Sequence, residues 1–89
     1  LDQKARRLSV VQPRLTSTLL RQTPATVVVI FIVDENGRVQ DPKVQRTTNP
    51  SFDRSALSAI KQWKFEPAKV QGRSVSSRLR QSFSFENST

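Results

Sequence analysis

The sequence comprises 89 residues with a formal net charge of +8, and it contains neither cysteine nor histidine. Without these residue types the chain lacks disulfides, thiolate metal sites, a cysteine nucleophile and the commonest general base, so we expect no enzyme, no metal site and no cofactor. The positive charge lies at the two ends of the chain. Residues 1–25 carry five basic and one acidic side chain, residues 26–49 carry three of each, and residues 50–89 carry seven basic and three acidic side chains. This distribution favours acidic partners.

The chain begins with a mixed, basic segment that shows no signal peptide and no apolar run long enough to span a bilayer. We interpret residues 1–11 as the end of a linker or as an extra short strand. The whole chain is interpreted as a domain excised from a longer protein, with any membrane anchor upstream. A short helix is expected over residues 14–22, because Pro13 suits the first helical position and Pro24 ends the run.

A β-hairpin is expected next. Residues 26–33 form a continuous run rich in Val and Ile, which predicts a strand covered on both faces. An Asp-Glu-Asn-Gly turn follows, and its last two residues, Asn36 and Gly37, tolerate positive φ. The return strand over residues 38–46 contains Pro42, which lacks a donor for the ladder, so this strand should lie at an edge or be bulged there.

A second helix is expected from Asn49, which can cap it, to about residue 64, because Pro67 forces the residue before it out of helical geometry. Apolar side chains at spacings of four, seven, eight and eleven predict one buried stripe. Its members are Phe52, Ala56, Ala59, Ile60 and Trp63. We interpret Trp63 as a core residue that, together with Phe65, wedges the helix against the sheet.

Gly72 predicts a turn, and residues 75–85 predict a third strand whose apolar and polar side chains alternate. The crossover through the second helix makes this strand parallel to the second strand, and Pro42 disfavours direct pairing between them. The most apolar strand should therefore be central. The expected fold is α+β, with the element order helix, strand, strand, helix, strand and a three-stranded sheet of strand order 2-1-3.

In this arrangement the last strand lies at an edge of the sheet and leaves backbone N–H and C=O groups unpaired. Arg73, Arg78 and Arg80 lie on or near it. Two interpretations stay open. The charges protect the edge against aggregation, or the edge accepts an extended acidic peptide as an added strand.

Several of these features together resemble the C-terminal domain of TonB-type energy transducers. They are the apolar stripe that ends in Trp63, the Trp-x-Phe-x-Pro exit over residues 63–67, the Asp-Glu-Asn-Gly turn and Gly72. The resemblance covers roughly residues 12–86 and leaves 87–89 as a tail. It implies a periplasmic domain that is tethered to the inner membrane, is coupled to a proton-driven motor there, and drives uptake of ligands such as siderophores through outer-membrane receptors.

The resemblance also implies the site. In the family, a short segment at the receptor's N-terminus, the TonB box, pairs with the backbone of the last strand. The corresponding residues here are Arg78, Leu79, Arg80, Gln81, Ser82, Phe83 and Ser84. The family further carries a Gln-Pro-x-Tyr-Pro stretch near the receptor box, so Gln12 and Pro13 are candidate receptor contacts, although Leu15 and Thr16 replace the Tyr and the second Pro.

Two other classes of function stay open. A basic domain of this size also suits nucleic acids, although no exposed pair of stacking aromatics is evident, so nucleic acid is not the expected partner. A TonB-like scaffold or homodimer is the other alternative. It arises because two helices can leave one face of the sheet uncovered, and we expect the N-terminal segment or a second copy of the chain to cover that face.

Overall fold

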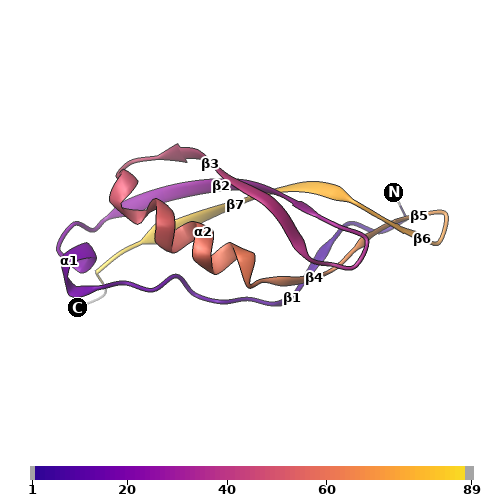
Figure 1. Ribbon diagram of the computed structural model, residues 1–89, viewed down its shortest axis with the longest axis horizontal. Coiled ribbons are helices and arrows are strands. Elements are labelled where there is room, and N and C mark those ends of the chain that lie inside the picture. Colours follow the sequence, from indigo (N-terminus) through magenta and orange to yellow (C-terminus); the bar gives the residue numbers. More distant parts are fainter. Residues whose placement is uncertain (1, 88–89) are drawn as a thin grey trace.

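The computed structural model describes residues 2–87, so most of the expected tail lies outside the described residues. The molecule is elongated, with principal extents of 48 × 22 × 16 Å (Figure 1). None of the helices in the described part of the chain is long and apolar enough to cross a bilayer. In chain order the elements are β1 (Arg6–Ser9), α1 (Ser17–Leu20), β2 (Ala25–Val33), β3 (Val39–Thr47), the 3-10 turn η1 (Pro50–Phe52), α2 (Asp53–Lys61), β4 (Lys64–Glu66), β5 (Ala68–Val70), β6 (Arg73–Val75) and β7 (Ser77–Phe85).

The central sheet has three antiparallel strands in the order β3-β2-β7, which confirms the predicted order and the predicted edge position of the last strand. β2 is central because its run of Val and Ile is apolar on both sides. It pairs with β7 without interruption through nine residue pairs, from Ala25 with Phe85 to Val33 with Ser77.

The core lies between one face of this sheet and α2, which crosses that face (Figure 1). Alternate residues of β2 are fully or almost fully buried there, namely Val27, Val29, Phe31 and Val33. The predicted stripe of the second helix is confirmed, because Phe52, Ala56, Ala59, Ile60 and Trp63 are all buried against them. Phe83 and Phe85 of β7 complete the cluster, with the rings of Phe52 and Phe85 4.8 Å apart.

The other edge strand, β3, is irregular. Its register against β2 shifts twice, between Val28 and Val29 and between Ile30 and Ile32. The second shift falls at Asp41 and Pro42, and Asp41 has a φ of 50°. Both expectations for this strand, an edge position and a bulge at the proline, are therefore confirmed.

The first helix is shorter than predicted, with one turn at Ser17–Leu20 in place of residues 14–22. Thr16 caps this turn, because its Oγ1 accepts a hydrogen bond from the Leu19 N–H at 3.2 Å. The residues before it are held extended, since the Arg14 carbonyl accepts from the Ser55 hydroxyl at 2.5 Å. Pro13 therefore lies in an extended segment and does not open a helix.

Three short strands after α2 were not predicted. β4 pairs with β1, and β5 pairs with β6 in a hairpin that turns at Gln71 and Gly72, both with positive φ. The exit after Trp63 is extended, as expected. The turn between β2 and β3 contacts it, because the Gly37 carbonyl accepts from the Phe65 N–H at 2.9 Å. A Cβ at Gly37 would lie 1.9 Å from the Phe65 carbonyl oxygen.

Candidate peptide-binding edge

The outer side of β7 carries unpaired backbone groups, and the register shows which residues supply them. Thr26 exchanges hydrogen bonds with Thr48, one to the Thr48 hydroxyl at 2.9 Å and one from the Thr48 N–H at 3.0 Å, so its backbone groups point away from β7. Backbone groups alternate in direction along a strand. The odd-numbered residues of β2 therefore bond to β7, and their partners on β7 are odd-numbered too.

It follows that the even-numbered residues of β7 direct their N–H and C=O groups to the free side. These residues are Arg78, Arg80, Ser82 and Ser84, and their side chains are exposed. Within residues 2–87, β2 is the one strand that pairs with β7. Among the described residues, the one outward carbonyl with a protein partner is that of Ser82, which accepts from the Gln81 side-chain amide at 2.9 Å. An incoming strand that uses this carbonyl would compete with Gln81.

The remaining predicted residues of this strand, Leu79, Gln81 and Phe83, lie on the same side of the sheet as α2 and line the space beside the N-terminal segment. Phe83 is buried, and Leu79 and Gln81 are partly buried. Their backbone groups bond to β2 and hold β7 in place. The implied site of residues 78–84 thus divides into one set that offers hydrogen bonds outward and one set that anchors the strand.

A trough lies between β7 and the N-terminal segment of the chain. It consists of two hollows that share Arg7 and Gln81. One, of about 490 Å³, is lined by Ala5, Arg6, Arg7, Phe65, Leu79 and Gln81. The other, of about 320 Å³, includes Gln12, Pro13 and Trp63 together with residues 81–86. The structure therefore brings the predicted contacts Gln12 and Pro13 beside the C-terminal half of β7.

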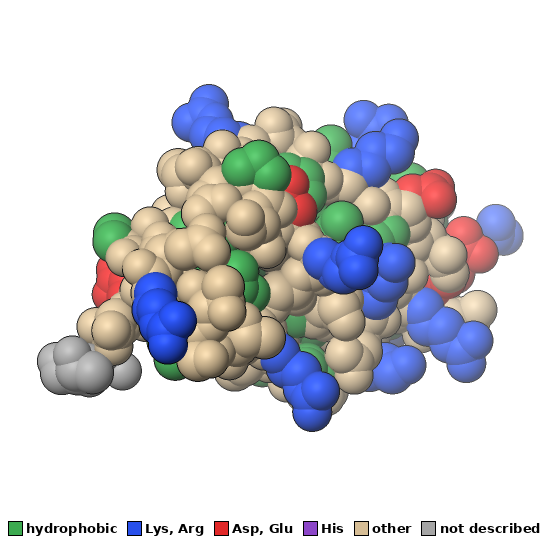
Figure 2. Space-filling view, turned by 60° about the vertical axis from the view of Figure 1, so that its left-hand side comes forward, with side chains coloured by type: hydrophobic (Ala, Val, Ile, Leu, Met, Phe, Trp, Pro, Cys, Tyr) green, Lys and Arg blue, Asp and Glu red, His purple; other side chains and the backbone are tan. Residues whose placement is uncertain are grey.

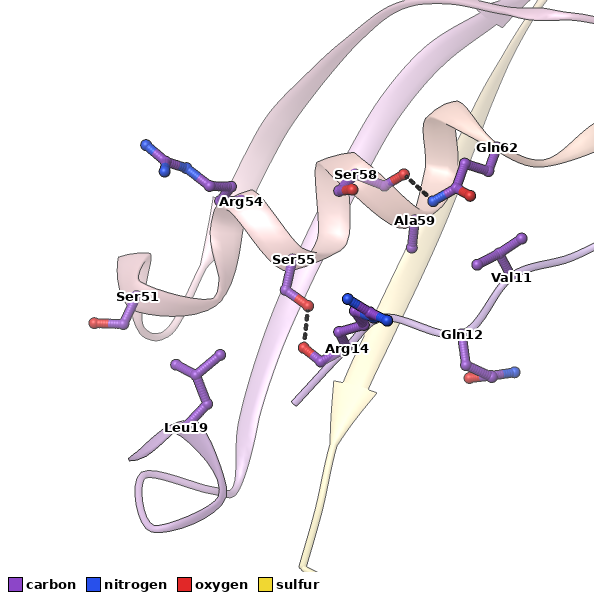
Figure 3. Close-up of a pocket in the computed structure, with 10 residues that line it drawn as sticks. All are labelled: Val11, Gln12, Arg14, Leu19, Ser51, Arg54, Ser55, Ser58, Ala59 and Gln62. Atoms are coloured by element: carbon purple, nitrogen blue, oxygen red, sulfur yellow. Dashed lines mark hydrogen bonds between the residues drawn. The ribbon is translucent and has the colours of Figure 1, made fainter. Parts of the chain in front are cut away.

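The wall of the trough opposite β7 is held in place by two hydrogen bonds from the helical layer. The Trp63 indole N–H donates to the Val11 carbonyl at 2.9 Å. The Ser55 hydroxyl donates to the Arg14 carbonyl (Figure 3). A buried tryptophan usually finds a partner for its N–H, but the sequence does not say which carbonyl. Sequence reasoning thus identified Trp63 as a core residue and missed that it positions the segment containing Gln12.

The start of the N-terminal segment is attached to β4 through the Glu66 carboxylate. The Glu66 carboxylate accepts from Gln3 at 2.9 Å and from Arg6 at 2.7 Å. The hydrogen bond from Gln3, followed by that from Arg6, holds the pKa of Glu66 below its usual value. The carboxylate is therefore ionised at neutral pH, which keeps both partners engaged.

A further hollow of about 620 Å³ lies between the N-terminal segment and α2 (Figure 3). Two of its polar side chains bond to backbone carbonyls, since Gln62 donates to the Ser58 carbonyl at 3.1 Å and Ser55 donates to the Arg14 carbonyl. Arg54 points away from it in Figure 3.

The surface around the edge is basic. Lys and Arg project widely over the face seen in Figure 2, with fewer acidic side chains between them. Within residues 2–87 the one ion pair is Arg6 with Glu66, so Arg78 and Arg80 have no carboxylate partner there. The described residues contain no group of three or more potential metal ligands. All six aromatic side chains, five Phe and one Trp, are buried, so the domain presents no aromatic surface for stacking bases.

This fold and this edge define a class of protein, which comparison with known proteins identifies. Residues 20–86 match the family described as Gram-negative bacterial TonB protein C-terminal, and the chain belongs to this family. Two relatives called Protein TonB, from Xanthomonas campestris pv. campestris strains B100 and ATCC 33913, are each 36% identical to it over 55 residues. That match covers 61% of this chain and 25% of each relative, so the chain spans at most about a quarter of their length there.

The fold is also that of a solved structure described as the solution NMR structure of Pseudomonas aeruginosa TonB CTD. The TM-score is 0.80 at 24% sequence identity, with 97% of this chain and 89% of the other covered. At this identity the likeness shows the fold. It agrees with the α+β arrangement predicted from the sequence.

Proposed function

We propose that this domain is the receptor-binding end of a TonB-type energy transducer. It works in the periplasm, tethered through preceding residues to the inner membrane. It binds the N-terminal TonB-box peptide of an outer-membrane receptor as an added strand beside β7, and so couples a proton-driven motor to ligand uptake. Membership of the family supports this proposal. The single observation that carries it is the regular, unpaired outer side of β7.

Backbone pairing supplies the general part of the affinity. Four residues face outward, and an added strand can bond to their N–H and C=O groups. Each bond contributes roughly 0.5–1.5 kcal/mol net, and this gain is opposed by the cost of ordering the peptide. Backbone bonds alone therefore leave a modest surplus, so side-chain contacts in the trough must supply the rest.

Side chains of the bound peptide would alternate between two environments. On one side they would enter the trough, whose walls include Phe65, Leu79 and Gln12. On the other side they would lie beside Arg78 and Arg80, which favour carboxylates. Exposed charge pairs of this kind contribute about 0.2–1 kcal/mol each, and they act chiefly on the rate of encounter and on its salt dependence.

A peptide-binding role requires no chemistry from the domain, so we propose that it is not an enzyme. A nucleic-acid role finds no support in the buried aromatic side chains. The alternative of a scaffold or homodimer differs in one measurable way, because it predicts association that depends on domain concentration and not on added peptide. Light scattering over a range of concentrations, with and without peptide, separates the two.

The direct test is an NMR titration of the labelled domain with synthetic receptor N-terminal peptides. We expect the largest amide shifts at Arg78, Arg80, Ser82 and Ser84, with smaller shifts along residues 5–15. Two matched peptides carry N-methyl groups at alternate residues, one at the residues whose N–H groups face β7 and the other at the residues between them. Only the second peptide, which leaves the edge-facing N–H groups free, should bind. If β7 does not respond while another surface does, the proposed site is wrong.

A further inference from the structure

The face of the central sheet turned away from α2 carries an apolar row between two basic rows. Residues directly opposite each other on neighbouring strands point to the same side of a sheet, so the register defines this surface. The apolar row belongs to β2, and the basic rows belong to β3 and β7. We call this surface the open face; its members are Val28, Ile30 and Ile32 in the apolar row and Lys43, Arg46, Arg78 and Arg80 in the basic rows.

No described segment covers the open face. The helix α2 packs on the opposite side (Figure 1). The N-terminal segment also lies on that side, because Ala5, Val11 and Leu15 pack against the core cluster. The expectation that this segment covers the second face is therefore wrong. Its position is determined by the Trp63 and Glu66 hydrogen bonds, which draw it to the helical layer.

The apolar row is recessed among longer basic side chains. Ile30 and Ile32 are partly exposed, and together with Lys43, Arg78 and Arg80 they line a shallow hollow of about 560 Å³. The aliphatic stems of arginine and lysine can lie along apolar surface, and Val28, beside Arg46, is only 5% exposed. A lipid surface would need apolar side chains that protrude, so this recessed shape favours a protein segment that reaches into it.

The charges of the open face restrict its occupant further. Its four cations form no ion pair within residues 2–87, and Asp41 is the one acidic side chain lining the hollow. A second copy of the chain seated on this face would bring two sets of cations together, which is unfavourable. The expectation of a second copy here is therefore disfavoured by charge, and an acidic partner is favoured.

We propose that the open face binds an acidic amphipathic helix of a partner protein. Its apolar stripe would lie on Ile30 and Ile32, and carboxylates on both flanks would lie beside the basic rows. The two basic rows are two strand spacings apart, about 10 Å, and an α-helix with its side chains is about 10 Å wide. The proposal does not depend on peptide binding at the β7 edge, because Lys43 and Arg46 belong to the opposite edge strand.

The test uses a synthetic amphipathic peptide of about five helical turns, with leucines on one stripe and glutamates on both sides of it. Binding to the full chain is followed by fluorescence anisotropy. A peptide of the same composition in scrambled order is the first control, and vesicles of anionic phosphatidylglycerol are the second. We expect the striped peptide to bind and the scrambled peptide and vesicles to bind much more weakly.

Charge reversal locates the site. The double variant Lys43→Glu with Arg46→Glu should weaken binding of the striped peptide about tenfold, since two exposed charge pairs are lost and inverted. The matched variant Arg54→Glu with Lys61→Glu, on the exposed side of α2, should leave binding nearly unchanged apart from a small long-range effect. Binding of receptor peptides at β7 should survive in both variants, which separates this proposal from the proposed function.

Three results would overturn the proposal. Equal binding of striped and scrambled peptides would show attraction by net charge alone. Equal weakening by the two double variants would show that the open face is not the site. Tighter binding to vesicles than to the striped peptide would assign the surface to lipid. Circular dichroism of each variant confirms that the fold is retained before these measurements are compared.

Discussion

β3 and β7 each span nine residues and pair with the same central strand, but only β3 has an irregular backbone. β3 contains Pro42, two register shifts and Asp41 in the left-handed region. Bulges and prolines on an edge are common means of blocking strand addition. β7 has nine uninterrupted pairs and no proline, and its outward groups remain unpaired by strands within the described residues.

The contrast shows that the residues of each edge strand determine whether that edge stays open to an added strand. One edge is irregular and the other is regular, although the same sheet could have carried protection on both. The basic side chains of β7 are compatible with both interpretations raised from the sequence. Arg78 and Arg80 repel a second β7 and attract acidic peptides, so the same charges can limit aggregation and select a partner.

The largest expected effect concerns the turn that joins β2 to β3. Gly37→Ala places a Cβ 1.9 Å from the Phe65 carbonyl oxygen and also strains a φ of 80°. We expect a loss of about 3 kcal/mol or more in the free energy of unfolding, measured by urea denaturation. Gly72→Ala is the control, because its φ is 77° but no atom lies within 4 Å, and it should cost about 1 kcal/mol. Equal losses of stability in the two variants would contradict the view that the Phe65 carbonyl oxygen leaves no room for a side chain at residue 37.

Two adjacent proline substitutions test the direction of the backbone groups of β7. The Gln81 N–H faces β2, so Gln81→Pro should cost about 3 kcal/mol of stability. The Arg80 N–H faces outward, so Arg80→Pro should leave the domain folded and abolish binding of receptor peptides. Thermal unfolding and calorimetric titration measure the two effects. A folded Arg80→Pro variant that keeps its affinity would rule out backbone pairing at this residue.

Trp63→Phe should loosen the wall opposite β7 while keeping most of the core. The variant loses the indole N–H that bonds to the Val11 carbonyl, at a cost of about 1–2 kcal/mol. We expect faster hydrogen exchange over residues 10–14 and weaker peptide binding, with β7 exchange unchanged. Phe52→Leu serves as a core control, since Phe52 lies in the cluster and does not line the trough. If Phe52→Leu has the same stability as Trp63→Phe and also weakens peptide binding, then loosening of the wall is not the cause of the weaker binding.

Neutralising charge on each edge in turn should distinguish the two edges. Arg78→Gln with Arg80→Gln should slow association with an acidic receptor peptide severalfold at low salt and flatten its salt dependence. The matched pair Lys43→Gln with Arg46→Gln, on β3, should have a smaller effect because its charges lie two strands away from the added strand. Stopped-flow association at several salt concentrations measures both. Indistinguishable rates would mean that net charge alone guides the encounter.

The smallest expected effect is pH dependence at the end of the β2–β3 hairpin. The Asp34 carboxylate accepts hydrogen bonds from the Arg38 N–H, the Gln40 side chain and the Asn36 N–H, which lowers its pKa below the usual 3.8. A lowered pKa contributes stability that is present above pH 3.8 and is lost as the pH falls through the folded-state pKa. We expect the amides of residues 36 and 38 to lose protection below pH 3.8. The loss should be absent in Asp34→Asn, and its persistence there would assign it to another group.

Much of the fold could be predicted from local pattern. The alternation of β7, the spacing of the Phe52-to-Trp63 stripe and the Asn36-Gly37 turn determine backbone conformation and burial within about a dozen residues, and the structure agrees with each. The helix over residues 14–22 was over-predicted, because Pro13 also suits extended chain and only the contact with Ser55 decides between the two. The β7 edge could be deduced from topology once β2 was recognised as central.

The sequence by itself determined the hairpin, the amphipathic helix, the strand order and the candidate edge, because periodicity encodes which side of an element is apolar. Only the tertiary structure decided that residues 5–15 run beside β7, that Trp63 holds Val11, and that one sheet face stays open with basic rows around Ile30. These contacts join residues about 50 or more positions apart, such as Trp63 with Val11 and Glu66 with Gln3. Local pattern carries no information about which distant carbonyl or carboxylate completes such a pair, since that depends on how the packed elements lie against each other.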